Sequence, residues 1–303
     1  MRMNRREFIG GVLSASVVPT FGAAYDKPEY HAFSRVFQFL KDPYRAADFL
    51  RSCGYDGVEW TVRKGGFLDS NTVTAEKMKT LKFAADKAGI KAENIVVDFL
   101  RGDDPGAERI VMLAADAGFK SFRGDYFKYD RTKAHRANFD VFRRGFDSLE
   151  KLARKSGLKA CYQNHSTYNK VIPLFGSLVW DLAVVVKDHD PKYIGVQYDP
   201  MHVRAEGGPS WDHTIGAIAP WIDIVCLKDF HYLLDATGKD WKRELVPAGK
   251  GIVDFAEVKR LMELEGVTSR YTVHYDYDFP EDEAGARAFA SSDLKYYRTI
   301  FGI

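Results

Sequence analysis

Two kinds of hydrophobic pattern alternate along the chain from residue 31 onward. Short β-branched or aromatic runs are followed by longer amphipathic segments, and this pair of patterns repeats eight times. The alternation predicts βα units and a parallel sheet. The strands are expected to end near Phe37, Glu59, Asp98, Asp125, Gln163, Asp199, Lys228 and His274. The helices are expected at Pro43–Ser52, Thr74–Ala88, Pro105–Ala117, Arg136–Ser156, Leu178–Val186, Trp211–Ile218, Phe255–Glu265 and Ala284–Ile300.

Glycines support this division of the chain. Several predicted helices stop at a glycine before the next strand, where a residue in the left-handed conformation closes a helix. These glycines are Gly54, Gly89, Gly118, Gly157 and Gly266. Regular stops of this kind are not expected from a β-sandwich or a helical bundle. We therefore predict an α/β fold, a (β/α)8 TIM barrel in a single domain over residues 25–303.

The segment from His231 to Pro247 is an irregular insertion in this repeat. It is rich in charged and aromatic residues and follows the seventh predicted strand. A segment at this position is either a lid over a site or an ordinary surface hairpin. The sequence leaves both interpretations open.

Residues 1–24 have the pattern of a cleavable export signal. Arg5 and Arg6 precede an apolar run that ends at Val18, and small residues close the segment. The run is too short to span a bilayer. The paired arginines resemble the twin-arginine signal, which exports folded proteins, and the alternative is an ordinary secretory signal. Both predict a periplasmic protein with no membrane span in the mature chain.

Charge and composition exclude some partners. The net charge of +2 falls to about zero once the predicted signal is removed. A near-neutral chain gives no reason to expect nucleic acid as a partner, and no glycine-rich phosphate loop follows any predicted strand. The three cysteines are odd in number and lie in or beside apolar runs, so we expect no structural disulfide. The oligomeric state stays open.

Candidate chemistry lies where the predicted strands end, because TIM barrels build their active sites at the carboxyl ends of the strands. Helix capping accounts for some acidic residues there, but it does not account for histidines and a lysine at the same depth. The polar strand ends are Glu59, Asp98, Arg123 with Asp125, Gln163 to His165, Asp199 with His202, Lys228 with Asp229, and His274 with Asp276.

These residue types suggest roles before any family is considered. Asp199 and His202 pair as acid and base. Lys228 either steers an oxyanion or forms a buried ion pair with Asp229. Arg123 either binds an oxygen-rich substrate or is a solvated surface residue. The side chains that suit sugar hydroxyls, a carbonyl or a metal are Gln163, Asn164 and His165, and Trp211 is a further candidate for substrate binding.

Read together, several motifs resemble the xylose isomerase-like TIM barrels known as sugar phosphate isomerases and epimerases. A secreted branch of that family is the most similar. The motifs are Gly54-Tyr-Asp-Gly-Val-Glu59, Gln163-Asn164-His165, Tyr198-Asp199 with His202, Leu227-Lys228-Asp229, and Gly249-Lys-Gly251-Ile-Val-Asp254-Phe255.

The resemblance implies one divalent metal, held by Glu, Asp, His and Glu from strands five to eight. Those places fall on Gln163, Asp199, Cys226 and His274, and only Asp199 matches. The loss of two carboxylates weakens affinity for Mg or Mn, whereas the remaining donors suit Zn better. Asp276 is a replacement carboxylate. Our expectation is a divalent metal, Zn, Mn or Mg, with Asp199, His274 and Gln163 as ligands.

The resemblance also implies an enzyme that removes a proton next to the carbonyl of a small sugar, sugar acid or keto-sugar, as an isomerase or epimerase. Candidate bases are Glu59, His165 and Asp276, while His202 and Lys228 bind or protonate the enolate oxygen. An exported setting argues against a phosphorylated substrate. The alternatives are a lyase or hydratase of 3-keto-glycosides, and a non-catalytic sugar-binding barrel.

Overall fold

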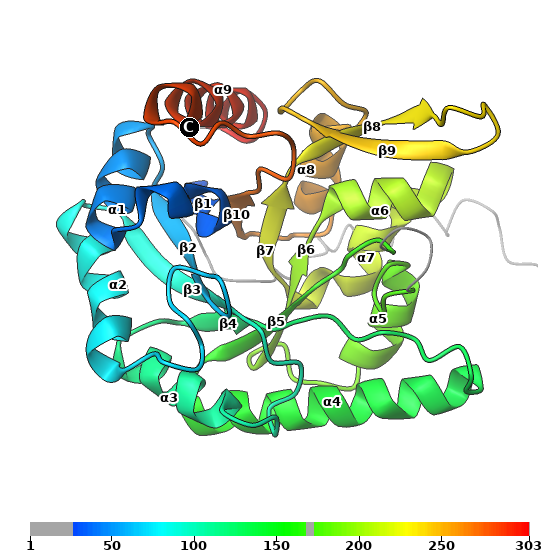
Figure 1. Cartoon of the computed structure of the whole chain (residues 1–303). Coiled ribbons are helices and arrows are strands. Elements are labelled where there is room, and N and C mark those ends of the chain that lie inside the picture. Colours follow the sequence, from blue (N-terminus) through cyan, green and yellow to red (C-terminus); the bar gives the residue numbers. More distant parts are fainter. Residues whose placement is uncertain (1–26, 168–172, 303) are drawn as a thin grey trace, which may run out of the picture.

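The computed structural model describes residues 27–167 and 173–302. Eight parallel strands close into a barrel in the order β1-β10-β7-β6-β5-β4-β3-β2, and helices surround it (Figure 1). This confirms the predicted TIM barrel. The predicted export signal lies outside the described residues. The barrel strands are β1 (Tyr30–Phe33), β2 (Gly57–Val62), β3 (Lys91–Val97), β4 (Ser121–Arg123), β5 (Lys159–Gln163), β6 (Ile194–Tyr198), β7 (Ile222–Leu227) and β10 (Arg270–Val273).

The helices follow the predicted pattern closely, because their ends carry recognisable caps. Asp42 accepts a hydrogen bond from the Tyr44 amide at the start of the first helix, and Thr74 caps the second through the Lys77 amide. The α-helices are α1 (Pro43–Ser52), α2 (Ala75–Lys87), α3 (Ala107–Asp116), α4 (His135–Ser156), α5 (Val179–Val186), α6 (Pro200–Gly207), α7 (Thr214–Ile218), α8 (Phe255–Leu264) and α9 (Glu283–Phe301). The five glycine stops all have positive φ.

Three predicted boundaries are wrong. The first strand ends at Phe33 rather than Phe37, because the chain turns into a 3-10 helix, η1 (Ser34–Leu40). Glu59 lies inside β2 rather than at its end. The predicted helix Trp211–Ile218 is a 3-10 helix, η2 (Gly208–His213), followed by the short α7.

The sequence also missed α6, which begins directly after Asp199. The Asp199 side chain accepts a hydrogen bond from the His202 amide, and Pro200 occupies the first helical position, where a missing amide proton costs nothing. This cap fixes the backbone between Asp199 and His202. It therefore holds two of the predicted site residues on a single helical turn.

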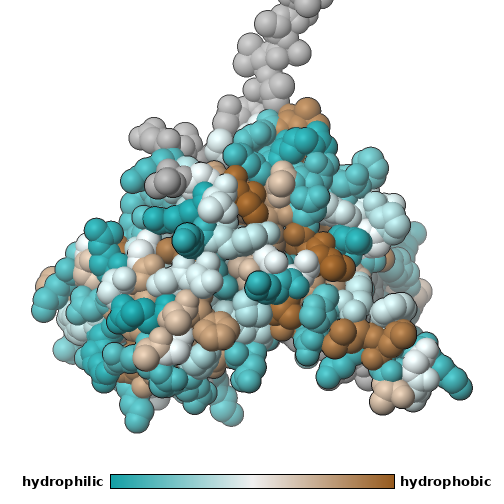
Figure 2. All heavy atoms as spheres, turned by 90° about the horizontal axis from the view of Figure 1, so that it is seen from above, coloured by the Kyte–Doolittle hydropathy of each residue, from teal (hydrophilic) through white to brown (hydrophobic). Residues whose placement is uncertain are grey.

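The irregular insertion forms an antiparallel hairpin of β8 (Asp229–Leu234) and β9 (Trp241–Val246). The hairpin extends beyond the carboxyl end of β7 and lies over α6 (Figure 1). Tyr232 in β8 donates a hydrogen bond to the carbonyl of Ala205 in α6. Seen from above, this face is mainly hydrophilic, with hydrophobic residues in scattered patches (Figure 2).

An ion-pair network fills the opposite, amino-terminal end of the barrel. Arg270, the first residue of β10, lies 2.8 Å from Glu93 and 3.3 Å from Asp223. Lys159, the first residue of β5, lies 2.7 Å from the other oxygen of Asp223. Because these buried charges are paired with one another, they have a structural role. The candidate catalytic residues are therefore those at the carboxyl end of the barrel.

The three cysteines, Cys53, Cys161 and Cys226, are buried as free thiols. Within residues 27–167 and 173–302, no helix is both long enough and apolar enough to cross a membrane.

Candidate functional site

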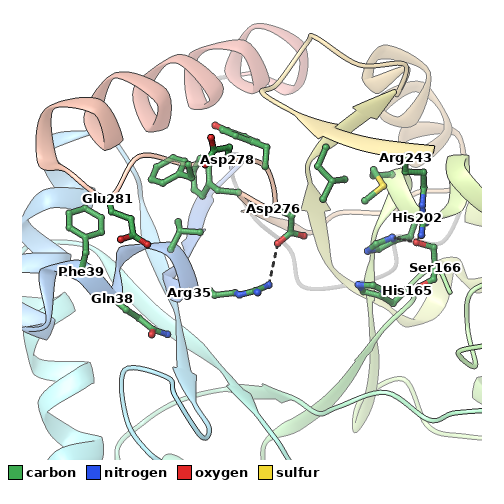
Figure 3. A pocket seen from close by; sticks show the side chains of 16 residues that line it. Arg35, Gln38, Phe39, His165, Ser166, His202, Arg243, Asp276, Asp278 and Glu281 are labelled. Carbon is green, nitrogen blue, oxygen red and sulfur yellow. Dashed lines mark hydrogen bonds and ion pairs between the residues drawn. The ribbon is translucent and has the colours of Figure 1, made fainter. Parts of the chain in front are cut away.

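A cavity of about 640 Å³ opens at the carboxyl end of the barrel (Figure 3). One wall carries Arg35 and Gln38 of η1, and the other carries His165, His202 and the hairpin residue Arg243. Asp276, three residues past β10, lies between the two walls. The volume is within the range of about 300–1,000 Å³ typical of ligand pockets.

Lys228 is the central cation of this region. It follows β7 directly and is buried, and its Nζ lies 3.1 Å from Asp199 Oδ2 and 2.8 Å from Asp276 Oδ2. Burial alone would lower the pKa of Lys228, but the charges of Asp199 and then Asp276 raise it above its usual value. Lys228 therefore stays protonated.

Asp276 is correspondingly held in its ionised form. Burial favours the neutral acid, but Lys228 and then His274 outweigh burial and keep the pKa of Asp276 below its usual range. Arg35 approaches the other carboxylate oxygen to 3.6 Å. Asp276 is thus ionised and lies between Lys228 and Arg35.

Lys228 does not pair with Asp229, which corrects one of the two interpretations offered by the sequence. The Asp229 carboxylate instead accepts backbone amides from Gly249 at 3.1 Å, Gly251 at 2.9 Å and Val253 at 3.2 Å. A Cβ on Gly251 would lie 2.1 Å from Asp229 Oδ1. The glycine motif before α8 therefore has a structural role: it wraps the chain around a buried carboxylate.

His202 is held in one tautomer by two neighbours. The Arg243 guanidinium, which only donates, bonds to Ser166 Oγ, and Ser166 Oγ lies 2.7 Å from His202 Nδ1. The serine proton is thus donated to Nδ1, and the imidazole proton is on Nε2. That Nε2 is buried, lies 3.5 Å from Asp199 Oδ2, and has no hydrogen-bond partner among residues 27–167 and 173–302. Burial, then the charges around it, lower the pKa of His202 well below its usual value.

His165 takes the opposite tautomer. Its Nδ1 lies 2.8 Å from the Ser166 carbonyl oxygen, which only accepts, so Nδ1 carries the proton and Nε2 carries the lone pair. Burial, and then the charge of Lys228, lower the pKa of His165 to about 3. The His165 and His202 ring centroids are 3.8 Å apart. Two neutral imidazoles, one an acceptor and the other a donor, therefore lie side by side on one wall.

A chain of hydrogen bonds fixes the floor of the site. Arg123 donates to the Tyr126 hydroxyl at 2.9 Å, so Tyr126 gives its own proton to Gln163 Oε1 at 2.7 Å. Gln163 must then present its amide nitrogen to Asp199 Oδ2, at 2.8 Å. The orientation of the amide follows from the fact that arginine only donates.

Glu59 and His274 form a second pair on the floor, with His274 Nε2 lying 3.4 Å from Glu59 Oε2. Asn94 and Thr272 also donate to the Glu59 carboxylate. Burial would raise the pKa of Glu59, but the hydrogen bond and charge of His274, with Arg123 and Asn94, lower it to about 2. Glu59 is thus ionised and fully engaged.

Other predicted residues lie away from the cavity. Asn164 holds the backbone of Asp199, accepting from its amide at 2.7 Å and donating to its carbonyl at 3.0 Å. Trp211 is buried in η2 and is not part of the cavity wall. Asp98 is exposed and accepts from the Lys64 amide and from Ser70. Of these three residues, Asn164 still acts on the site, because its two hydrogen bonds hold the backbone of Asp199 in place.

A divalent metal does not fit the donors at the place that the sequence suggested. Asp199 Oδ2 already faces two donors, Lys228 Nζ and Gln163 Nε2. Burial, then nearby carboxylates, raise the pKa of the Cys226 thiol well above its usual value. Across the described ranges, no group of three or more His, Cys, Asp or Glu side chains is placed to hold an ion. A metal cation placed between Asp199, Gln163 and His274 would lie next to the positively charged Lys228 ammonium, which would repel it.

Sequence reasoning gave no role to Arg35, Tyr126, Ser166 or Arg243. Arg243 lies 77 residues from Ser166 along the chain, and only the hairpin brings it to the cavity. A polar residue in the His231–Pro247 insertion, which the sequence leaves open as a lid or a surface hairpin, is the only signal that could have indicated it. Tyr126 follows Arg123 closely, but its link to Gln163 depends on how adjacent strands are aligned.

Comparison with known proteins gives a consistent picture of the fold. Residues 47–291 match the family model described as xylose isomerase-like TIM barrel. No curated protein matches the chain.

Solved structures resemble the chain over nearly its whole length. D-psicose 3-epimerase with D-fructose superposes with a TM-score of 0.68 at 14% identity, covering 91% of this chain and all of its own. The 3-keto-D-glucoside 4-epimerase from E. coli gives 0.67 at 15% identity, with 90% and 100% coverage. The IOLI protein with a bound zinc atom gives 0.70 at 12% identity, with 91% and 100% coverage.

Proposed function

Because the chain belongs to the xylose isomerase-like TIM barrel family, we propose that it is a sugar isomerase or epimerase that moves a proton next to a carbonyl without a metal ion. The observation that carries the proposal is the buried Lys228 ammonium, which contacts the cavity residue Asp276 and whose charge acts on two neutral histidines of opposite tautomer. The names of the similar structures, a psicose 3-epimerase and a keto-glucoside 4-epimerase, support the substrate class.

The first step is proton abstraction by His165. Its Nε2 lone pair takes the proton from the carbon next to the carbonyl, the C–H electron pair becomes the new C=C bond, and the carbonyl oxygen gains the negative charge. The low pKa of His165, about 3, keeps Nε2 unprotonated at neutral pH. The negative charge that develops on the substrate stabilises the imidazolium as it forms.

Lys228 and His202 stabilise the enolate oxygen. Lys228 supplies a fixed positive charge, and His202 supplies the Nε2–H that has no partner within the described part of the chain. Donors that are already oriented toward a developing charge cost no reorganisation when the reaction occurs. Return of the proton from His165 to the neighbouring carbon, with the hydroxyl proton of the first carbon passing to the enolate oxygen, gives the isomer. Delivery of a proton from solvent to the other face of the original carbon, with the His165 proton released to solvent, gives the epimer.

Elimination from a 3-keto-glycoside is the second candidate reaction. It begins with the same abstraction, but the enolate expels the aglycone instead of taking up a proton. The cavity of about 640 Å³ supports this candidate, because it is larger than a single sugar ring requires. Free aglycone released from a 3-keto-glycoside distinguishes the lyase from an isomerase.

Hydrogen–deuterium exchange tests the proposal. The protein is incubated in D2O with ketohexoses, aldohexoses and 3-keto-glycosides, and exchange next to the carbonyl is followed by NMR. We expect exchange with at least one class, and its loss in H165Q. Binding of a sugar without any exchange would identify a sugar-binding barrel and contradict the enzymatic proposal.

We also propose that the chain is exported to the periplasm. The support is the arginine pair, apolar run and small-residue end of residues 1–24. Replacement of Arg5 and Arg6 by lysine should retain the protein in the cytoplasm on cell fractionation. Export of the double variant at the normal level would point to an ordinary secretory signal.

A further inference from the structure

Three arginines gather on the β1–β4 side of the barrel mouth. Arg35 lies in η1, Arg63 follows β2 directly, and Arg123 is the last residue of β4. The guanidinium carbons of Arg63 and Arg123 lie 5.8 Å and 5.6 Å from the centroid of one ring, that of Phe33. Phe33 in turn stacks on His274 at 4.4 Å. The two guanidinium groups are thus next to the floor of the proposed active site.

Arg63 and Arg123 form no ion pair within residues 27–167 and 173–302, although Arg123 donates a hydrogen bond to the Tyr126 hydroxyl and Arg35 pairs with Asp276. Arg123 is buried, and its Nε has no hydrogen-bond partner within residues 27–167 and 173–302. The Arg63 side chain makes no hydrogen bond or ion pair with any other residue that the structure describes. Burial, then the charges of Arg123 and Arg35, lower the pKa of Arg63. The arginines therefore repel one another, and a bound anion would relieve that repulsion.

Over the two described ranges, the surrounding acids form no ion pair with Arg63 or Arg123. Burial would lower the pKa of Arg123, but Tyr126 and then Glu59 raise it above its usual value. The Glu59 carboxylate is engaged by His274, Asn94 and Thr272. Asp125 is exposed and forms no ion pair with Arg63 or Arg123 in the ranges that the structure describes. Arginines that are half-buried or buried for purely structural reasons are normally paired with a carboxylate. At the amino-terminal end of this barrel, for example, Arg270 is paired with Glu93.

We propose that Arg63 and Arg123, with Arg35 at the rim, bind a carboxylate of the substrate, so that the substrate is a sugar acid rather than a neutral sugar. This inference rests on the proposed function for the sugar part of the ligand. Guanidinium groups present paired, coplanar N–H donors that match the two oxygens of a carboxylate. The arginines lie across the barrel from β7, which carries Lys228. The ligand is therefore anchored at one side while its carbonyl faces Lys228.

Titration calorimetry on the full chain tests this inference. The probes are D-glucuronate and D-gluconate, with D-glucose as the neutral match and D-glucose 6-phosphate as a second anion. We expect the acids to bind about tenfold or more tightly than glucose, since hydrogen bonds to charged groups contribute about 1.5–3 kcal/mol each. R63Q should abolish this preference and R63K should keep part of it, because lysine retains the charge but loses the planar fork.

R51Q is the matched control, because Arg51 is exposed at the end of α1. Three results would overturn the inference: equal affinity for glucuronate and glucose, no binding of either acid, or an unchanged preference in R63Q. In each case the exchange assay would still decide the reaction. Tight binding of the phosphate ester alone would also overturn it. Arg63-dependent acid binding without proton exchange on any sugar would support the anion site and contradict the proposed function.

Discussion

Lys228 Nζ lies 3.1 Å from Asp199 Oδ2, so an ammonium group meets the one carboxylate that matches the family's expected metal ligands. Gln163 fills a second position around that oxygen with its amide nitrogen. Positive charge is thus supplied to the site by a side chain of the protein. A charge fixed by the fold is present in every molecule and needs no ion from the surroundings.

Replacement of Lys228 by methionine should lower kcat by about 100-fold to 1,000-fold, the cost of losing one oriented donor to an oxyanion. The exchange assay measures this loss. K228M should also reduce the free energy of unfolding by about 3–5 kcal/mol, because the buried Asp199 and the partly buried Asp276 lose their cation. K228M/D276N should recover part of that stability but little of the activity. An active K228M variant would contradict the role of Lys228.

The tautomer of His202 should depend on Ser166. In the wild-type protein, the 15N shifts of His202 should show the proton on Nε2, because Ser166 donates to Nδ1. S166A should give a mixture of tautomers and lower kcat by about tenfold to 100-fold, less than the full contribution of an acid–base group. S210A, at an exposed serine of η2, is the control. An unchanged His202 spectrum in S166A would contradict the relay.

The stability of the protein should fall as the pH decreases from about 6.5 to 3. His165 stays neutral in the folded state because burial, then Lys228, lower its pKa to about 3. In the unfolded chain His165 takes up a proton below about 6.5, so acid favours unfolding by about 1.4 kcal/mol per pH unit in this window. Urea unfolding at several pH values measures the slope. H165Q should show a smaller slope, and an identical slope would contradict the low pKa.

Gly251 should not accept a side chain. A Cβ there would lie 2.1 Å from Asp229 Oδ1 and 2.3 Å from the Phe230 carbonyl oxygen. G251A should therefore destabilise the protein by about 1–3 kcal/mol, the usual cost of forced packing. G207A is the matched control, because its added Cβ would lie 3.5 Å from Trp211, an ordinary contact. Equal melting temperatures for the two variants would contradict this role.

The sequence predicted the fold well because each βα unit carries its own signals. Five of the predicted strand ends, at Asp98, Gln163, Asp199, Lys228 and His274, fall within one residue of the observed ends. The first strand was misjudged because an apolar run that forms η1 reads like a strand. The hydrophobic pattern does not distinguish the two over so few residues.

The candidate site was only partly predictable, since its contacts cross the barrel. The sequence gives Lys228 and Asp229 as neighbours, but strand alignment turns Lys228 toward Asp199 and Asp276. Arg243 reaches Ser166 through a hairpin whose packing has no local signature. Which charges pair is decided by three-dimensional proximity, and a sequence pattern reports only separation along the chain.

The most direct test of the account is proton exchange by metal-free protein. The chain is treated exhaustively with a chelator, elemental mass spectrometry verifies that no metal remains, and exchange next to the sugar carbonyl is then measured in D2O. Metal-independent chemistry at Lys228 predicts that exchange continues at the untreated rate. Loss of exchange on chelation, with recovery on adding Mn or Zn, would contradict the central claim.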